Sequence, residues 1–353
     1  MTGPAAKRAR GSDEYGIAQR AMLIVHPHLH PRRSGVTAHV ELIAKAQGEL
    51  GEVKVLGQLL PPSLPHLTWG ELWRRSGREW VLWHAHRNNE LIWGALLRLL
   101  GRKLRLVYTS HSPRPVGRFT RFLLRFADQV VTLNRIAAEW VHHPSTIVQH
   151  GVDLSRFSPP DDRRAAFEAL GVPGRHGVGV VGRVRPNKGQ GDFVEAIAPL
   201  LETHPEWTPV LVGLAKDTGW AEGLKAKTKG RLVLAGEHRD VVPWYRGLSI
   251  LVHPSYAEAF SMVLIEAMAA GCCVVATRIA AVPEVIEDGK TGFLFEPGDV
   301  EGLRRILERL LADPGLVETV GRAARAEAER RRGIEHEAKA LLAVYQRAAT
   351  VER

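Results

Sequence analysis

Most of the side chains that could do chemistry lie in one segment of the second half of the chain, residues 253–268. Glu258 stands just before an expected helix start at Ser261, and Glu266 lies inside that helix, with seven residues between the two acids. A helix N-terminus offers free N–H groups and about half a positive charge, which suits a phosphate, while carboxylates accept hydrogen bonds from hydroxyls. Two acids at this spacing are also compatible with a capping acid and a solvated helix residue. The apolar flanks put Glu266 on a largely buried helix, so its carboxylate needs a partner.

A basic loop at residues 180–189 is the second such segment. A predicted strand ends at Gly182, Arg183 and Lys188 follow, and a helix begins near Gly189. Glycine permits close approach of a ligand to the backbone, and the two cations suit a diphosphate. The glycine spacing fits neither a Walker loop nor a dinucleotide fingerprint. A solvated basic turn is the alternative interpretation.

The first half of the chain carries weaker signals. Gly35 opens a helix after the first predicted strand and so predicts a second anion-type pocket. His111 follows a predicted strand at 104–109, where a histidine could donate to a sugar hydroxyl or act as an acid or base. His84 and His86 are two residues apart without a convincing third ligand, so a zinc site is not expected. Each of these histidines could equally be an ordinary loop or core residue.

Four arginines recur at intervals of three or four residues in the first half, interleaved with phenylalanine and leucine. The spacing predicts a basic amphipathic helix, whose function would be to contact anionic lipid or an acidic acceptor. An amphipathic helix with a solvated basic face is the alternative. The four residues are Arg114, Arg118, Arg121 and Arg125.

Bulk properties narrow the class of protein. A chain of 353 residues suggests two domains, and a net charge of +10 favours phosphate-bearing partners. The basic residues are spread over both halves and no recognition helix or zinc finger is recognisable, so nucleic acid is not an expected partner. Cys272 and Cys273 are adjacent in an apolar run, where neighbours point to opposite faces of a strand. They should not form a disulfide, which fits a reducing, cytoplasmic compartment.

No apolar run in the sequence reaches the roughly 18 residues of a membrane-spanning helix.

Both halves alternate short β-rich apolar runs with helical-period segments, which predicts an α/β protein with two doubly wound parallel sheets. Strands are expected at 22–26, 53–57, 80–84, 104–109, 129–133, 147–149, 177–181, 209–212, 231–234, 250–253, 272–276 and 292–295. Helices are expected at 36–50, 88–100, 117–127, 135–142, 189–201, 221–229, 261–270, 300–312 and 334–347.

A proline- and aspartate-rich stretch interrupts the alternation and predicts an interdomain linker. The two open α/β domains would then face each other across a cleft, which is the default ligand site. The expected organisation is a polar tail at 1–20, a first α/β domain at 21–150, a linker at 151–162, a second α/β domain at 163–330 and a C-terminal helix at 331–353 that packs back toward the first domain.

The basic loop and the two acids together resemble glycosyltransferase family 4, the retaining enzymes of the GT-B fold. The resemblance covers essentially the whole chain and includes the segment 149–153, the pair Pro283-Glu284 and the strand 292–294. It implies two Rossmann-like domains facing across a cleft, with an acceptor-binding domain at 21–150 and a donor-binding domain at 163–330. No Asp-x-Asp element is present, so the enzyme is expected to need neither a metal nor a cofactor besides its sugar-nucleotide substrate.

The resemblance also implies roles for individual residues. Arg183 and Lys188 correspond to the diphosphate clamp, Glu258 to the acid near the donor sugar and Glu266 to the acid that binds the ribose. His111 corresponds to the histidine that faces the reacting sugar. The expected catalytic residues are therefore Arg183, Lys188, Glu258 and His111. The expected donor-binding residues are Gly35, Gly182, Arg183, Lys188, Glu258, Ala259, Phe260, Ser261, Met262 and Glu266.

Two positions depart from the family pattern. Ala259 stands where the family usually has glycine, and Ser34-Gly35 replaces paired glycines. Both changes narrow the expected pocket, and neither removes a charged group.

Within the family, the segments 83–90, 186–191 and 244–246 resemble bacterial lipopolysaccharide core mannosyltransferases. These use GDP-mannose and a Kdo-lipid A acceptor. The resemblance therefore implies a GDP- or UDP-linked donor, an anionic glycolipid or saccharide acceptor and a place at the inner face of the cytoplasmic membrane. Two alternatives stay open: a GT-B sugar-nucleotide 2-epimerase and a non-enzymatic nucleic-acid-binding protein.

Overall fold

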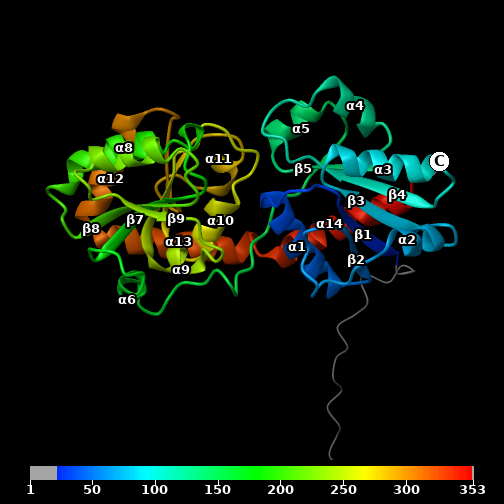
Figure 1. Ribbon diagram of the computed structural model, residues 1–353, viewed down its shortest axis with the longest axis horizontal. Coiled ribbons are helices and arrows are strands. Elements are labelled where there is room, and N and C mark those ends of the chain that lie inside the picture. Colours follow the sequence, from blue (N-terminus) through cyan, green and yellow to red (C-terminus); the bar gives the residue numbers. More distant parts are fainter. Residues whose placement is uncertain (1–21, 352–353) are drawn as a thin grey trace, which may run out of the picture.

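Two six-stranded parallel sheets, one in each half of the chain, organise the computed structural model, which describes residues 22–351 (Figure 1). The polar tail predicted at 1–20 lies outside the described residues. The strand orders are β2-β1-β3-β4-β5-β6 and β12-β11-β10-β7-β8-β9, and every pair is parallel. The prediction of an α/β protein with two parallel sheets is confirmed.

The N-terminal lobe alternates strands and helices. In chain order it contains β1 (Leu23–His28), α1 (Gly35–Gly48), β2 (Val53–Gly57), α2 (Trp69–Ser76), β3 (Val81–Ala85), α3 (Asn88–Leu99), β4 (Leu104–Thr109), α4 (Arg118–Leu124), β5 (Gln129–Thr132), α5 (Arg135–Val141) and β6 (Thr146–Ile147).

The C-terminal lobe follows the same plan after the turns of residues 151–162. It contains α6 (Arg163–Glu168), β7 (His176–Val181), a 3-10 helix (Pro186–Lys188), α7 (Gln190–Ile197) with a 3-10 extension (Ala198–Leu201), β8 (Trp207–Val212), α8 (Thr218–Lys227), β9 (Val233–Gly236), α9 (Val242–Gly247), β10 (Leu248–His253), α10 (Met262–Ala269), β11 (Cys273–Thr277), α11 (Val282–Val285), β12 (Phe293–Phe295), α12 (Val300–Ala312) and α13 (Pro314–Arg331).

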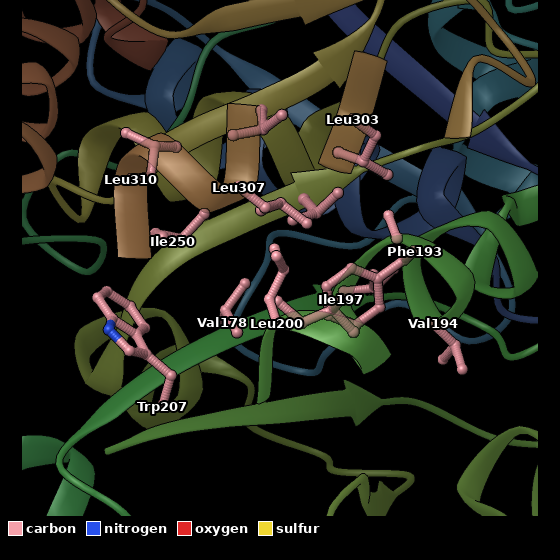
Figure 2. Packing of buried hydrophobic residues seen from close by; sticks show 14 of the residues in the cluster. Val178, Phe193, Val194, Ile197, Leu200, Trp207, Ile250, Leu303, Leu307 and Leu310 are labelled. Atoms are coloured by element: carbon pink, nitrogen blue, oxygen red, sulfur yellow. The ribbon is translucent and has the colours of Figure 1, made fainter. Parts of the chain in front are cut away.

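Alternation along the strands places neighbouring side chains in different cores. In β10, Ile250 packs into one apolar cluster and Leu251 into the cluster on the other face of the sheet. Cys272 and Cys273 divide in the same way and are both free and buried, as predicted. Helix α12 contributes three leucines to the first cluster, which also contains Ile250 (Figure 2). These are Leu303, Leu307 and Leu310.

The last helix, α14 (Ile334–Ala349), leaves the C-terminal lobe and packs on the N-terminal one (Figure 1). It contacts α1, β4 and β5 and buries Leu341, Val344 and Tyr345 in the apolar cluster there. Because of this crossing, side chains from the end of the chain reach the interior of the first domain.

Several expected boundaries need correction. Helix α4 spans only Arg118–Leu124, so Arg114 precedes the helix and Arg125 is its C-cap. Strand β9 begins at Val233 and not at residue 231, and β6 ends at Ile147. Helix α8 begins earlier than predicted, since the Asp217 side chain accepts a hydrogen bond from the Trp220 N–H and caps it.

Five helices were not predicted: α2, α6, α9, α11 and the long α13. Within residues 22–351, none of the helices combines the length and apolar character required to cross a membrane.

Candidate active site between the lobes

A cavity of about 380 Å³ lies between the lobes and is lined from both halves of the chain. The loops after β1, β4, β7 and β10 all contribute, so the carboxyl ends of strands in both sheets face it. The predicted site residues that line it are Gly35, His111, Arg114, Lys188, Glu258, Ala259, Phe260 and Met262. Gly182, Arg183, Ser261 and Glu266 are not among its lining residues. A larger cavity of about 580 Å³ near Pro160 and Arg322 contains none of the predicted residues.

Lys188 and Glu258 form an ion pair in the cavity wall. The same carboxylate oxygen, Oε1, accepts a hydrogen bond of 3.0 Å from the Ser255 hydroxyl. Gly189 makes this approach possible, because it has a φ of 70° and a Cβ there would lie 1.9 Å from the Pro254 carbonyl oxygen. The two loops that carry the pair therefore touch through a position that only glycine can fill.

His253, the last residue of β10, lies beneath this ion pair and was not predicted as a site residue. Its Nε2 atom is 3.6 Å from Glu258 Oε1 and has no hydrogen-bond partner within the described part of the chain. Burial lowers the pKa of His253 to about 4, so the ring is neutral at neutral pH. A polar residue that ends an otherwise apolar strand was the available sequence signal.

Arg183 does not join the pair in this structure. Its side chain is exposed, while its carbonyl oxygen accepts a hydrogen bond of 3.0 Å from the Gln190 side chain. Arg185, which was not predicted, lines the cavity. The structure therefore brings Lys188 and Glu258 together and leaves the side chain of Arg183, five residues before Lys188 on the same loop, outside the pair.

Glu266 has the partner that its burial requires. One of its oxygens, Oε2, accepts a hydrogen bond of 2.7 Å from the Tyr245 hydroxyl, which confirms that expectation. Burial raises the pKa of Glu266, and the bond from Tyr245 opposes that effect. The acid lies on α10, about one helical turn beyond Met262, which lines the cavity.

Direct hydrogen bonds join the two lobes next to the cavity. Asn134 caps α5 with its side-chain oxygen and donates from its nitrogen to the Ala259 carbonyl oxygen at 2.7 Å. Glu284 accepts from the Arg135 N–H at 3.2 Å and from the Gln149 side chain at 2.8 Å. Phe260, beside Ala259, packs its ring edge-on against His150 at a centroid distance of 5.4 Å. None of these contacts between lobes was predicted.

His111 is engaged on both sides of its ring. Its Nε2 shares a hydrogen bond of 3.2 Å with His86, and its Nδ1 shares one of 3.3 Å with His150. His86 continues the row to His26 at 3.2 Å. Burial lowers the pKa values of His86 and His111 well below the usual range. A sugar hydroxyl can reach a ring nitrogen of His111 only if one of these bonds opens.

Glu337 of α14 ends this row of histidines. Its Oε1 lies 3.0 Å from His150 Nδ1 and 3.2 Å from His39 Nε2, and its Oε2 accepts from the Gly151 N–H at 2.7 Å. Burial pushes the pKa of Glu337 upward, but the neighbouring His39 and His150 outweigh it and hold the pKa well below that of an ordinary carboxyl. An ionised acid is thus buried against two imidazoles, those of His39 and His150, which line the cavity.

Comparison with known proteins identifies the family to which this chain belongs. A family model described as glycosyl transferases group 1 matches residues 175–313. The lipopolysaccharide core biosynthesis mannosyltransferase LpcC of Rhizobium leguminosarum bv. viciae is 38% identical over 92% of this chain and 96% of its own length. Its counterpart LpsB of Rhizobium meliloti is 35% identical over 93% of this chain and 98% of its own. The chain belongs to the group 1 glycosyltransferases.

Solved structures bear out the fold of this glycosyltransferase. Anabaena HepE in complex with UDP and glucose superposes with a TM-score of 0.78 at 22% identity, over 92% of this chain and 99% of that one. A glycosyltransferase from Rickettsia africae reaches 0.80 at 19% identity, over 94% and 100%. The predicted GT-B arrangement of two Rossmann-like domains is confirmed.

Membership of this enzyme family settles one alternative interpretation of the sequence and weakens the other. The glycosyltransferase relatives rule against a non-enzymatic nucleic-acid binder, and the two relatives described above are both named as mannosyltransferases, which does not support an epimerase. The site residues that the sequence did not indicate are His39, His150, Arg185, Asn134, His253 and Glu337.

Proposed function

We propose that this glycosyltransferase is a retaining family 4 enzyme that moves a hexose, with mannose from GDP-mannose as the leading donor, to a lipopolysaccharide-core or related saccharide acceptor. The observation that carries the proposal is the Lys188–Glu258 pair in the cavity between the lobes, at the carboxyl ends of β7 and β10. The two full-length relatives, whose names state lipopolysaccharide core mannosyl transfer, favour this donor and acceptor. The UDP in the HepE complex keeps a uridine donor as the second choice.

Donor binding would exchange partners within the ion pair. The diphosphate takes the place of Glu258 as the partner of Lys188, and Arg183 turns inward from its exposed position to add a second cation. Glu258 is then available to accept hydrogen bonds from hydroxyls of the sugar. Glu266, held by Tyr245, accepts from the ribose hydroxyls.

The transfer step follows from these positions as a front-face displacement. The bond from the anomeric carbon to the diphosphate oxygen breaks, and the bond to the acceptor oxygen forms on the same face. The acceptor proton passes to the leaving phosphate oxygen. Lys188 and Arg183 stabilise the charge that develops on that oxygen, so this mechanism requires neither a metal nor a cofactor.

An exposed basic and apolar surface on the N-terminal lobe suits an anionic glycolipid. The four arginines around α4 are all exposed, and Phe119 and Phe122 beside them are 60% and 52% exposed. The adjoining helix α3 adds exposed Trp93 and Leu99. Aromatic and cationic side chains in one surface favour the interface of an anionic membrane. We place the acceptor and the inner-membrane surface on this side.

Vesicle flotation tests the membrane contact. Wild-type protein is expected to float with anionic vesicles and not with neutral ones, and replacement of Arg118 and Arg121 by Gln should abolish flotation. Replacement of Arg322 and Arg330 on α13 by Gln removes the same charge elsewhere and should leave it intact. Equal flotation of both double variants would contradict the assignment.

Donor and reaction are tested together by nucleotide release. GDP-mannose should raise the melting temperature more than UDP- or ADP-sugars do, and GDP should appear only when an acceptor is present. The product should keep the anomeric configuration of the donor, as read by NMR. Conversion of the donor without an acceptor would instead support an epimerase.

A further inference from the structure

Three buried side chains beside the cavity come from parts of the chain that are far apart. His39 lies on α1, His150 follows β6, and Glu337 lies on α14. Glu337 Oε1 is 3.2 Å from His39 Nε2 and 3.0 Å from His150 Nδ1, and one ligand atom of each residue lies within 4.8 Å of the others. Both histidines line the cavity.

The spacing of these atoms fits a four-coordinate metal ion. Zinc bonds of about 2.0–2.1 Å in tetrahedral geometry separate neighbouring ligand atoms by about 3.3–3.4 Å. The two nitrogen–oxygen separations are only slightly shorter, so small side-chain movements would admit the ion. Two histidines and one carboxylate with a fourth position open to a cavity is a ligand set that zinc uses in proteins.

The contacts around the three ligands also fit a metal site. The other nitrogen of His150 shares a hydrogen bond of 3.3 Å with His111, and the other oxygen of Glu337 accepts from Gly151 at 2.7 Å. Such outer contacts orient ligands and fix the tautomer of a metal-bound histidine. Metal binding requires the ring hydrogens to lie on His150 Nε2, which faces His111, and on His39 Nδ1, which has no hydrogen-bond partner among residues 22–351.

A second group of three histidines in the same lobe is a poorer candidate. His26, His84 and His86 also bring their nitrogens within 4.8 Å of one another, but no acid belongs to that group. Both nitrogens of His84 already bond Tyr345 and Thr109. A divalent charge there would be enclosed without an acidic ligand, which is costly, whereas the first group includes the carboxylate of Glu337.

We propose that His39, His150 and Glu337 form a binding site for one divalent transition-metal ion, with zinc as the expected ion and cobalt as its spectroscopic substitute. The ion would link α14 to α1 beside the cavity, through Glu337 and His39. It takes no part in the displacement described above, in which Lys188 and Arg183 carry the charge.

Titration of chelator-stripped wild-type protein with Co²⁺ tests the site without any donor or acceptor. One ion per chain should bind, with the intense visible absorption of tetrahedral cobalt, and Zn²⁺ should remove that absorption. Either metal should raise the melting temperature. Absence of the absorption band, or a weak band like that of aqueous cobalt, would overturn the proposal. Because activity is not measured, failure of the proposed transfer reaction would leave this result unaffected.

Variants assign the ion to its ligands. Glu337→Gln keeps the size of the side chain and should weaken metal binding at least about 100-fold, as should His39→Asn. The matched control is His28→Asn, which removes a buried histidine that bonds Thr37 outside the group and should bind as wild type does. His84→Gln tests the second group. Loss of binding in His84→Gln with retention in His39→Asn or Glu337→Gln would contradict the assignment.

Discussion

The two walls of the cavity use different chemistry, although each is built at the carboxyl ends of a six-stranded parallel sheet. The C-terminal wall carries fixed charge, with Lys188 and Glu258 on loops that follow the adjacent strands β7 and β10. The N-terminal wall carries a row of buried imidazoles whose pKa values are lowered by burial, and it ends at Glu337 from the far end of the chain. Under the proposed function, the donor diphosphate meets the charges of the C-terminal lobe, while the N-terminal lobe offers mainly hydrogen-bonded imidazoles to the reacting groups.

The largest effect is expected from the charge of the C-terminal wall. Lys188→Ala should lower kcat at least about 100-fold, on the scale of one lost oxyanion donor, with folding intact. Lys229→Ala removes a cation of the same lobe that pairs with Glu202 on the surface and should leave kcat unchanged. Near-wild-type turnover in Lys188→Ala would contradict the proposal that the charge of the C-terminal wall stabilises the leaving diphosphate.

Variants of Arg183 and Arg185 test which of the two arginines stabilises the diphosphate together with Lys188. Arg183→Ala should lower kcat by about 100-fold if the exposed side chain turns toward the diphosphate, as proposed. Arg185→Ala should lower it less than about tenfold, since the side chain lines the cavity without a proposed role in charge stabilisation. The reverse order of the two effects, measured by steady-state kinetics, would assign the clamp to Arg185.

Glu266 should affect donor binding more than turnover. Glu266→Gln keeps an oxygen for the Tyr245 hydroxyl but removes the charge that the ribose hydroxyls are proposed to meet, so donor affinity should fall roughly tenfold. Calorimetric titration with GDP-mannose measures the change. Glu222→Gln on α8 is the control, and an unchanged affinity in Glu266→Gln would remove the ribose assignment.

Asn134 tests the contact between the walls. Asn134→Ala removes both the cap of α5 and the bond to the Ala259 carbonyl, so the melting temperature should fall, by a stability change of about 1 kcal/mol or more. Asp162→Ala removes the cap of α6 alone and should cost less. Equal losses in the two variants would mean that the bond between the lobes adds no stability.

Removal of metal ions with a chelator should have the smallest effect on the rate of transfer. Activity in EDTA is expected to stay within about twofold of the untreated rate, because Lys188 and Arg183 supply the charge that a Lewis acid would otherwise provide. Initial rates with and without chelator measure it. A strict requirement for a divalent ion would contradict the proposed displacement.

Strong local signals made much of the fold predictable. The bounds of β2, β4 and α12 agree with prediction, because these segments have clear apolar patterns and, for α12, an aspartate cap. Helix α13 escaped prediction because its buried residues are mostly small, and no apolar stripe results. Among them, Gly321 packs where a Cβ would lie 2.3 Å from the Gly271 carbonyl oxygen.

The site was predictable where its residues share a short motif. Lys188 and Glu258 stand out through their loops, and the structure places them in contact. The group of His39, His150 and Glu337 was not predictable in this way, because it exists only when α14 crosses to the first lobe. The row of imidazoles that engages both nitrogens of His111 depends equally on tertiary packing.

The structure of the enzyme with GDP-mannose bound, or with a non-transferable analogue, tests the central claim most directly. The diphosphate should lie against the Lys188 amine and the N-terminus of α10, with the sugar beside Glu258 and the ribose beside Glu266. A donor bound elsewhere, or bound with the Lys188–Glu258 pair still closed, would contradict the account.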